Sequence, residues 1–185
     1  MAQNVVAVWS RCGPAGSRSL THRAAITLDG HQCEFGFGDS VSSADRAAEL
    51  EEGRSERYFA GALREDTILV AEADGDLVAY VQFGDVCIPE VEVRPGDQAL
   101  QRLYVDAPLQ GAGLGRKLIE HPRLAGATRI YLTVWEKNRR AVRLYERFGF
   151  ERGGTTTFTI GSEEVEDLVL ALDRDERCMQ RENNH

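Results

Sequence analysis

Apolar residues recur along the chain with two spacings, and each spacing predicts a type of element. Apolar positions three and four residues apart predict helices over residues 42–63 and 139–148. A shorter helix over 114–120 must stop before Pro122, which cannot continue a helix. Runs of β-branched and aromatic residues predict strands over 67–73, 77–83, 99–105, 128–134, 155–160 and 166–172. This mixture of strands and helices predicts an α/β fold with a mixed sheet.

Turn residues divide these elements. Asp74 and Gly75 separate the first two predicted strands and predict a hairpin, because both turn positions favour positive φ. Gly53 divides the helical pattern of residues 42–63 into two helices, and Gly149 ends the helix over 139–148. The predicted organisation is a poorly patterned N-terminal segment, one domain and a frayed polar tail, over residues 1–38, 39–172 and 173–185.

Composition narrows the class of protein. A chain of 185 residues with 42% hydrophobic and 28% charged residues suits one ordinary globular domain. No apolar run approaches the roughly 20 residues that span a bilayer. The four cysteines lie far apart without a C-x-x-C pair, so a zinc site or a disulfide framework is disfavoured. We expect a cytoplasmic protein without a metal cofactor.

The net charge of −8 argues against general affinity for nucleic acid or an anionic membrane, and neither is expected as a partner. The charge is unevenly distributed. Residues 39–97 contain 15 acidic and 5 basic residues, whereas residues 98–152 contain 11 basic and 5 acidic ones. This asymmetry is consistent with one region that binds a cation and another that binds an anion. A solvated surface is the alternative.

A glycine-rich loop, Gln110-Gly-Ala-Gly-Leu-Gly-Arg-Lys117, links a predicted strand to the helix over 114–120. Glycines allow close approach to a ligand, and amides at a helix start favour phosphate. A Walker A loop is excluded because Arg116 and Leu118 stand in the wrong places, and the same two residues exclude a dinucleotide-binding fingerprint. For the glycine cluster alone, a flexible turn is an equal alternative.

Two signatures carry a family resemblance. The strand end Leu103-Tyr104-Val105 followed by Gln110-x-x-Gly113-x-Gly115 resembles the acetyl-coenzyme A signature of the GNAT acetyltransferase superfamily. The runs Val134-Trp-Glu-Lys-Asn138 and Ala141-x-x-Leu-Tyr145-x-x-x-Gly149-Phe150 resemble the family's second signature, in the family's order. The pattern Gly154-x-x-x-Phe158-x-x-Gly161 and then Asp167 is similar to the spermidine/spermine branch. Weaker similarity covers residues 40–172.

The resemblance implies a mixed, mostly antiparallel sheet that is flanked by helices and splayed between its fourth and fifth strands. Pantetheine would pair with the backbone of Leu103 and Val105, and the pyrophosphate would rest on amides from Gly111 to Arg116. The implied cofactor-binding residues are Leu103, Tyr104, Val105, Gln110, Gly111, Ala112, Gly113, Leu114, Gly115, Arg116, Asn138 and Tyr145. Nearby basic residues either bind the 3′-phosphate or form a solvated helix face.

The resemblance also assigns catalytic roles. Tyr145 matches the family's general acid, which protonates the departing thiolate; the alternative is a core residue on the helix's apolar stripe. Asn138 caps the following helix and, by resemblance, also contacts pantetheine. Glu90 and Glu92 are the candidate bases, and both would lie on one face if their stretch is extended. Water relays are the alternative to either glutamate. A backbone N–H near Val105 would stabilise the oxyanion.

The implied function is transfer of an acetyl group from acetyl-CoA, as cosubstrate, to a primary amine by direct attack. A small amine or polyamine is the expected acceptor, since the acidic region would attract a cation. A protein or peptide amine is one alternative, and a non-catalytic acyl-CoA-binding module is another. Homodimers are common in the family, and the sequence leaves the oligomeric state open.

Overall fold

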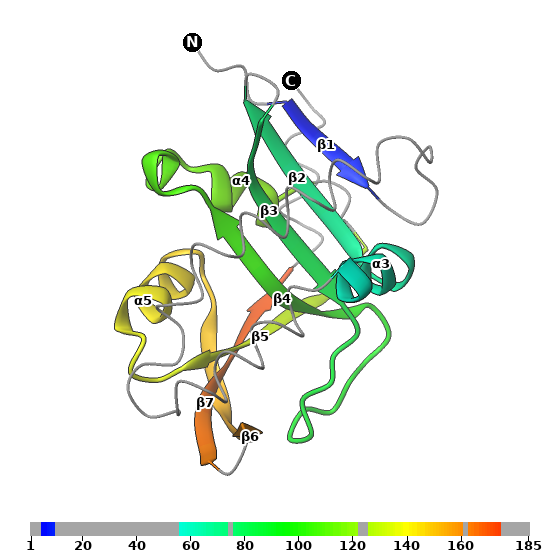
Figure 1. Ribbon diagram of the computed structural model, residues 1–185. Coiled ribbons are helices and arrows are strands. Elements are labelled where there is room, and N and C mark those ends of the chain that lie inside the picture. Colours follow the sequence, from blue (N-terminus) through cyan, green and yellow to red (C-terminus); the bar gives the residue numbers. More distant parts are fainter. Residues whose placement is uncertain (1–4, 10–55, 74–75, 122–125, 161–162, 175–185) are drawn as a thin grey trace.

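The computed structural model describes residues 5–9, 56–73, 76–121, 126–160 and 163–174. Within these ranges one sheet has the strand order β1-β2-β3-β4-β5-β7-β6 (Figure 1). Neighbouring strands are antiparallel, with β4 and β5 as the parallel pair. The predicted mixed, mostly antiparallel sheet is confirmed. The strands are β1 (Val5–Trp9), β2 (Thr67–Ala73), β3 (Asp76–Gly84), β4 (Asp97–Val105), β5 (Arg129–Trp135), β6 (Glu151–Ile160) and β7 (Glu163–Asp173).

The sequence analysis assigned no strand to β1, which pairs with β2 at the edge of the sheet. A run of five apolar residues with no turn signal beside it does not by itself predict a strand, because the strand that pairs with it lies about 60 residues further along the chain. The last two strands are longer than predicted, because each continues its ladder with the other beyond its apolar run. The predicted division at Gly53, the turn at residues 74–75 and the tail beyond residue 174 lie outside the described residues.

The helices pack on opposite faces of the sheet. They are α3 (Glu56–Glu65), the 3-10 helix η3 (Ala107–Leu109), α4 (Leu114–Ile119) and α5 (Arg139–Arg147). Side chains alternate along a strand, so Leu69 of β2 packs with α4 and α5, whereas Ile68 packs with α3. The loop between β3 and β4 also packs on the α3 face, where Ile88 meets Tyr131 of β5.

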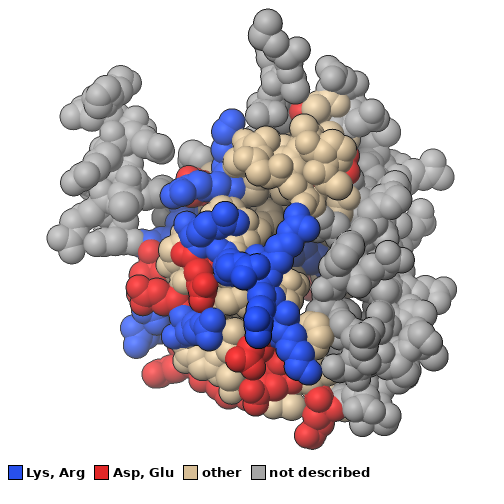
Figure 2. All heavy atoms as spheres, turned by 90° about the vertical axis from the view of Figure 1, so that its left-hand side faces the viewer, with Lys and Arg blue, Asp and Glu red and all other residues tan. Residues whose placement is uncertain are grey.

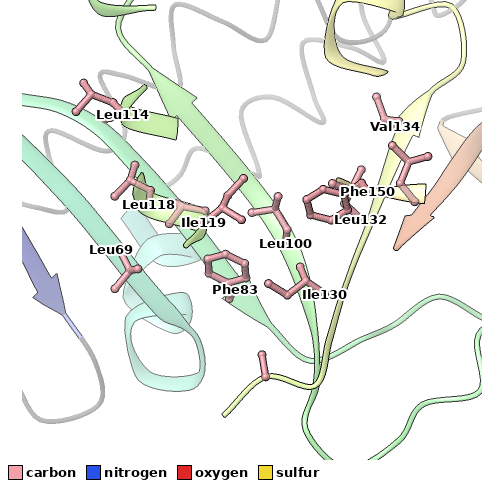
Figure 3. Packing of buried hydrophobic residues seen from close by; sticks show 14 of the residues in the cluster. Leu69, Phe83, Leu100, Leu114, Leu118, Ile119, Ile130, Leu132, Val134 and Phe150 are labelled. Atoms are coloured by element: carbon pink, nitrogen blue, oxygen red, sulfur yellow. The ribbon is translucent and has the colours of Figure 1, made fainter. Parts of the chain in front are cut away.

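The largest hydrophobic cluster joins α4 and α5 to the sheet (Figure 3). Leu118 of α4 and Ile130 of β5 are fully buried in it. A helix of six residues is not stable alone, so tertiary packing of Leu114, Leu118 and Ile119 maintains α4. This packing holds the start of α4 in place beside β4.

Strands β4 and β5 separate after a short paired stretch. Residues 97–99 of β4 pair with residues 129–131 of β5. Beyond that stretch β4 remains on β3 as far as Val105, and β5 remains on β7 as far as Trp135. The two strands therefore diverge toward the side that carries α4 and α5 (Figure 1). The predicted splay is confirmed.

A β-bulge precedes the stretch of β4 that has separated from β5. The register changes from Gln82 opposite Arg102 to Phe83 opposite Leu100, which leaves Gln101 as the extra residue in β4. Because of this extra residue, Leu100 and Leu103 both pack in the cluster on the α4 face, although an odd spacing would otherwise place them on opposite faces.

Candidate functional site

Free backbone amides line the loop between η3 and α4. The amide of Ala112 donates to the carbonyl of Leu109 at 3.2 Å, so it is engaged within the loop. Across the described chain, the structure shows no acceptor for the other amides from Gly111 to Arg116. Helix starts leave their first amides unpaired, and here the preceding loop adds two more. Five N–H groups are thus available to an anion: those of Gly111, Gly113, Leu114, Gly115 and Arg116.

Two glycines are required by this loop conformation. Gly111 has φ of 86° and Gly113 has φ of 83°, a region that side chains other than glycine rarely adopt. A Cβ at either position would meet nothing within 4 Å, so the space beside the amides is open. A Cβ at Gly115 would lie 3.6 Å from a methyl of Leu103 and 3.7 Å from one of Val105. The start of α4 therefore lies directly against the splayed end of β4.

Gln110 connects β4 to α5. Its side-chain amide donates to the backbone carbonyl of Val105 at 3.1 Å, and its Oε1 accepts from the guanidinium of Arg140. The side chain that the resemblance assigned to cofactor binding thus makes two contacts inside the protein. Its evident effect is to hold the end of β4, the loop and α5 in one arrangement.

Tyr145 lies on the inner side of α5. Its ring makes an edge contact with Phe150, with centroids 5.6 Å apart, and packs on the main cluster. Burial raises the pKa of Tyr145 to about 12, because desolvation disfavours the phenolate. The phenol is therefore protonated at neutral pH. Asn138 caps α5, since its Oδ1 accepts from the amide of Ala141 at 3.1 Å, which confirms the capping interpretation.

Basic side chains gather over α4 and α5 (Figure 2). Arg116 is paired with Glu120 at 2.7 Å, and a shallow hollow on α5 is lined by Arg140, Arg143, Arg147 and Glu146. Arg140 contacts Gln110 at the start of the loop with the free amides, and this basic face suits a multiply charged anion. The exposed members are Arg116, Lys117, Lys137, Arg139, Arg140, Arg143 and Arg147.

The two candidate bases lie elsewhere. Glu90 and Glu92 are exposed in the loop between β3 and β4, where a turn joins the amide of Val91 to the carbonyl of Ile88. The stretch is therefore not extended, and the condition for placing both on one face is not met. The loop packs on the α3 face, whereas Tyr145 lies on the α4 and α5 face. The structure brings Tyr145, the loop and β4 together and leaves the glutamates across the sheet.

Comparison with known proteins identifies the family. The sequence profile of the acetyltransferase (GNAT) domain matches residues 64–152. An uncharacterised N-acetyltransferase of Mycobacterium tuberculosis is 33% identical over 128 residues, which are 66% of this chain and 76% of that protein. The chain belongs to the GNAT acetyltransferase family. This GNAT chain has the splay that the family resemblance implied, and the N-cap and glycine loop that the residues themselves predicted.

Two further comparisons are informative about this GNAT chain. A spermine/spermidine N(1)-acetyltransferase of Bacillus subtilis is 39% identical over 90 residues. The match covers 46% of this chain, which spans only 59% of that relative's length. The PaiA N-acetyltransferase of Thermoplasma acidophilum, solved in complex with coenzyme A, superposes with a TM-score of 0.65. At 15% identity over 93% of this chain and 99% of the other, that likeness shows the fold alone.

Neither of the two buried polar residues among those described, Gln82 and Thr156, was singled out from the sequence. Thr156 of β6 is 2% exposed, and its hydroxyl has no hydrogen-bond partner among the described residues. Three consecutive threonines over residues 155–157 look equivalent in sequence, and only the pairing of β6 with β7 shows which one is buried. The described residues contain no group of three or more potential metal-ligating side chains and no helix long and apolar enough to cross a bilayer.

Proposed function

We propose that this protein is an acetyl-CoA-dependent N-acetyltransferase that transfers the acetyl group to a primary amine of a small molecule by direct attack. One observation carries the proposal: five free amides lie at the start of α4, next to the edge of β4 that has separated from β5. This arrangement offers an anion site and a strand edge that β5 does not cover within one short stretch of chain.

The residues present fit acetyl-CoA. The amides of Gly111, Gly113 and the first turn of α4 would hold the pyrophosphate, and the open space beside the glycines accommodates it. The backbone of Leu103 and Val105 would pair with pantetheine along the splayed edge. The Val105 carbonyl already accepts from Gln110, so further pairing relies on its second lone pair. The exposed arginines and lysines near α5 would neutralise the 3′-phosphate.

Acetyl-CoA, when bound, supplies a thioester carbonyl that an amine can attack. The phenol of Tyr145 is protonated at neutral pH and burial raises its pKa further, so its hydroxyl would be a hydrogen-bond donor to the departing thiolate sulfur. The same burial would raise the pKa of a thiol in this pocket, which makes the proton transfer less unfavourable. A backbone N–H near Val105 would stabilise the oxyanion.

The acceptor would approach from the α3 face, opposite α4 and α5. An aliphatic amine arrives protonated and must lose a proton before it attacks. Glu90 and Glu92 lie on this face and are exposed, so either carboxylate, directly or through water, is our candidate base. The name of the Bacillus subtilis relative supports a polyamine as the acceptor.

The test is thiol release from acetyl-CoA with a panel of primary amines. We expect Tyr145→Phe to lower kcat about 10²- to 10⁴-fold and to leave coenzyme A affinity unchanged, as for a lost general acid. Tyr131→Phe is the matched control, because that hydroxyl accepts from Arg129 on the opposite face. Tight coenzyme A binding without turnover of any amine would contradict the proposal and identify a non-catalytic acyl-CoA-binding module.

A further inference from the structure

An isolated carboxylate lies on the α3 face of the sheet. Asp167 of β7 pairs across the sheet with Trp135 of β5 on one side and with Thr156 of β6 on the other. Directly opposed residues of antiparallel strands project from the same face, so the three side chains form one lateral row. Trp135 is the last residue of β5, so this row lies level with the splayed end of the sheet.

The row contains two polar groups that the protein leaves unsatisfied. Thr156 is 2% exposed, and its Oγ1 has no partner in the described part of the chain. Asp167 is half-buried, and the structure shows no hydrogen bond or ion pair to it from a described residue. Burial alone raises the pKa of Asp167 to about 6, and no neighbouring cation offsets this effect. A buried polar group without a partner costs stability, which implies a ligand or bound water.

We propose that Asp167 binds a second ammonium group of the acceptor, so that the acceptor is a diamine or polyamine. This inference rests on the proposed function, because it uses the acceptor side of that site. A carboxylate is a hydrogen-bond acceptor, and an ammonium group has three donors that can satisfy it. The ammonium of Lys137 lies 5.5 Å from the centre of the adjacent Trp135 ring.

The row lies where it could bind the diamine nitrogen that does not react, because it is one strand away from the opening where the other nitrogen is acetylated. β7 lies one strand beyond β5, about 4.8 Å from the strand that borders the opening. In an extended four-carbon diamine the two nitrogens are about 6 Å apart. When one nitrogen is at the opening between β4 and β5, the other is therefore within reach of Asp167.

The experiment compares 1,4-diaminobutane with 1-aminobutane, which has the same carbon chain and lacks the second ammonium. Binding is measured by calorimetry in the presence of coenzyme A, and turnover by thiol release from acetyl-CoA. We expect Asp167→Asn to weaken diaminobutane binding and to lower its kcat/KM about 10- to 100-fold, mainly through KM. For 1-aminobutane, binding and kcat/KM should stay within about twofold of the wild-type values, and so should the affinity for coenzyme A. Thr156→Val should leave the values for both amines within about twofold of the wild type, because the Thr156 hydroxyl has no surface that a ligand could contact.

Glu166→Gln is the matched control, since Glu166 is exposed on the same strand and projects from the other face. Folding is checked by thermal unfolding, and Asp167→Asn should not lower Tm because it removes a desolvated charge. If Asp167→Asn lowers kcat/KM equally for the diamine and the monoamine, or lowers it for neither, Asp167 does not bind the second ammonium group. If diaminobutane binding depends on Asp167 but diaminobutane is not acetylated, the binding role of Asp167 is supported and the proposed function is contradicted. If diaminobutane is acetylated at the same rate with and without the Asp167 carboxylate, the proposed function is supported and the binding role of Asp167 is contradicted.

Discussion

Gly113 has a left-handed backbone conformation, so its replacement by alanine, which adds one methyl group, tests the anion site. Gly113 has φ of 83°, and a Cβ there would meet no atom within 4 Å. Gly113→Ala therefore introduces no clash within the protein, and its cost arises from the backbone conformation. Gly115→Ala is the matched control, because Gly115 does not have a positive φ and its Cβ would make ordinary contacts of 3.6–3.8 Å.

The expected magnitude follows from that conformation. A residue with a Cβ costs about 1–2 kcal/mol in the left-handed region. Gly111, Ala112 and Gly113 are exposed, so the free protein can relax the loop and binding must restore it. A cost of this size corresponds to a loss of affinity of about 5- to 30-fold. Alanine has the higher helix propensity, so Gly115→Ala should leave Tm unchanged or raise it.

The assay is isothermal titration of coenzyme A into the wild type and both variants, with thermal unfolding on the same samples. We expect weaker binding for Gly113→Ala with a Tm decrease of at most about 8 °C, since 1 kcal/mol corresponds to about 2–4 °C at this chain length. Affinity for Gly115→Ala should match the wild type. Together these results would place the anion on the amides that Gly113 orients.

Two outcomes would refute this reasoning. If Gly113→Ala binds coenzyme A within twofold of the wild type, the loop conformation does not determine binding. If Gly115→Ala loses as much affinity as Gly113→Ala, crowding is responsible and not the positive φ. Titration of coenzyme A lacking the 3′-phosphate adds an independent comparison, because its affinity should fall in the wild type and in both variants by the same factor.

Two further predictions concern α5. Asn138→Ala should lower the free energy of unfolding by about 1 kcal/mol in urea, whereas Asn138→Asp keeps the cap to Ala141 and should cost less. The folded protein favours the neutral phenol of Tyr145, whose pKa is raised from 10 to about 12. This contribution is fully present below pH 10 and is lost as the pH rises through 12, by about 3 kcal/mol. Tyr145→Phe should reduce this alkaline dependence, and an unchanged dependence would contradict it.

Much of the fold could be predicted from local patterns. The strands over residues 67–73 and 99–105 and the helix over 139–148 were predicted within about two residues, because their apolar spacing is local. The glycine loop was predicted for the same reason. β1 was missed, because its assignment depends on pairing with a strand that is distant in sequence.

The candidate site was predicted unevenly. The loop and the α5 cap follow from residue types at fixed short spacings, and the structure places both beside the open end of β4. Several strands together decide on which face of the sheet a side chain lies. They also decide whether a buried polar group has a hydrogen-bond partner. Glu90 and Glu92 were therefore predicted without knowledge that their loop lies across the sheet from Tyr145, and Thr156 was not predicted at all.

The sequence by itself determined the order of the elements from residue 67 onward, the glycine loop and the family, because all three depend on neighbours a few residues apart. The tertiary structure alone decided that β4 leaves β5 after residue 99 and that Asp167 and Thr156 lie side by side on neighbouring strands without a partner among the described residues. Strand pairing and desolvation arise from segments far apart in the chain. Their energies depend on which segments meet, and local sequence does not encode that.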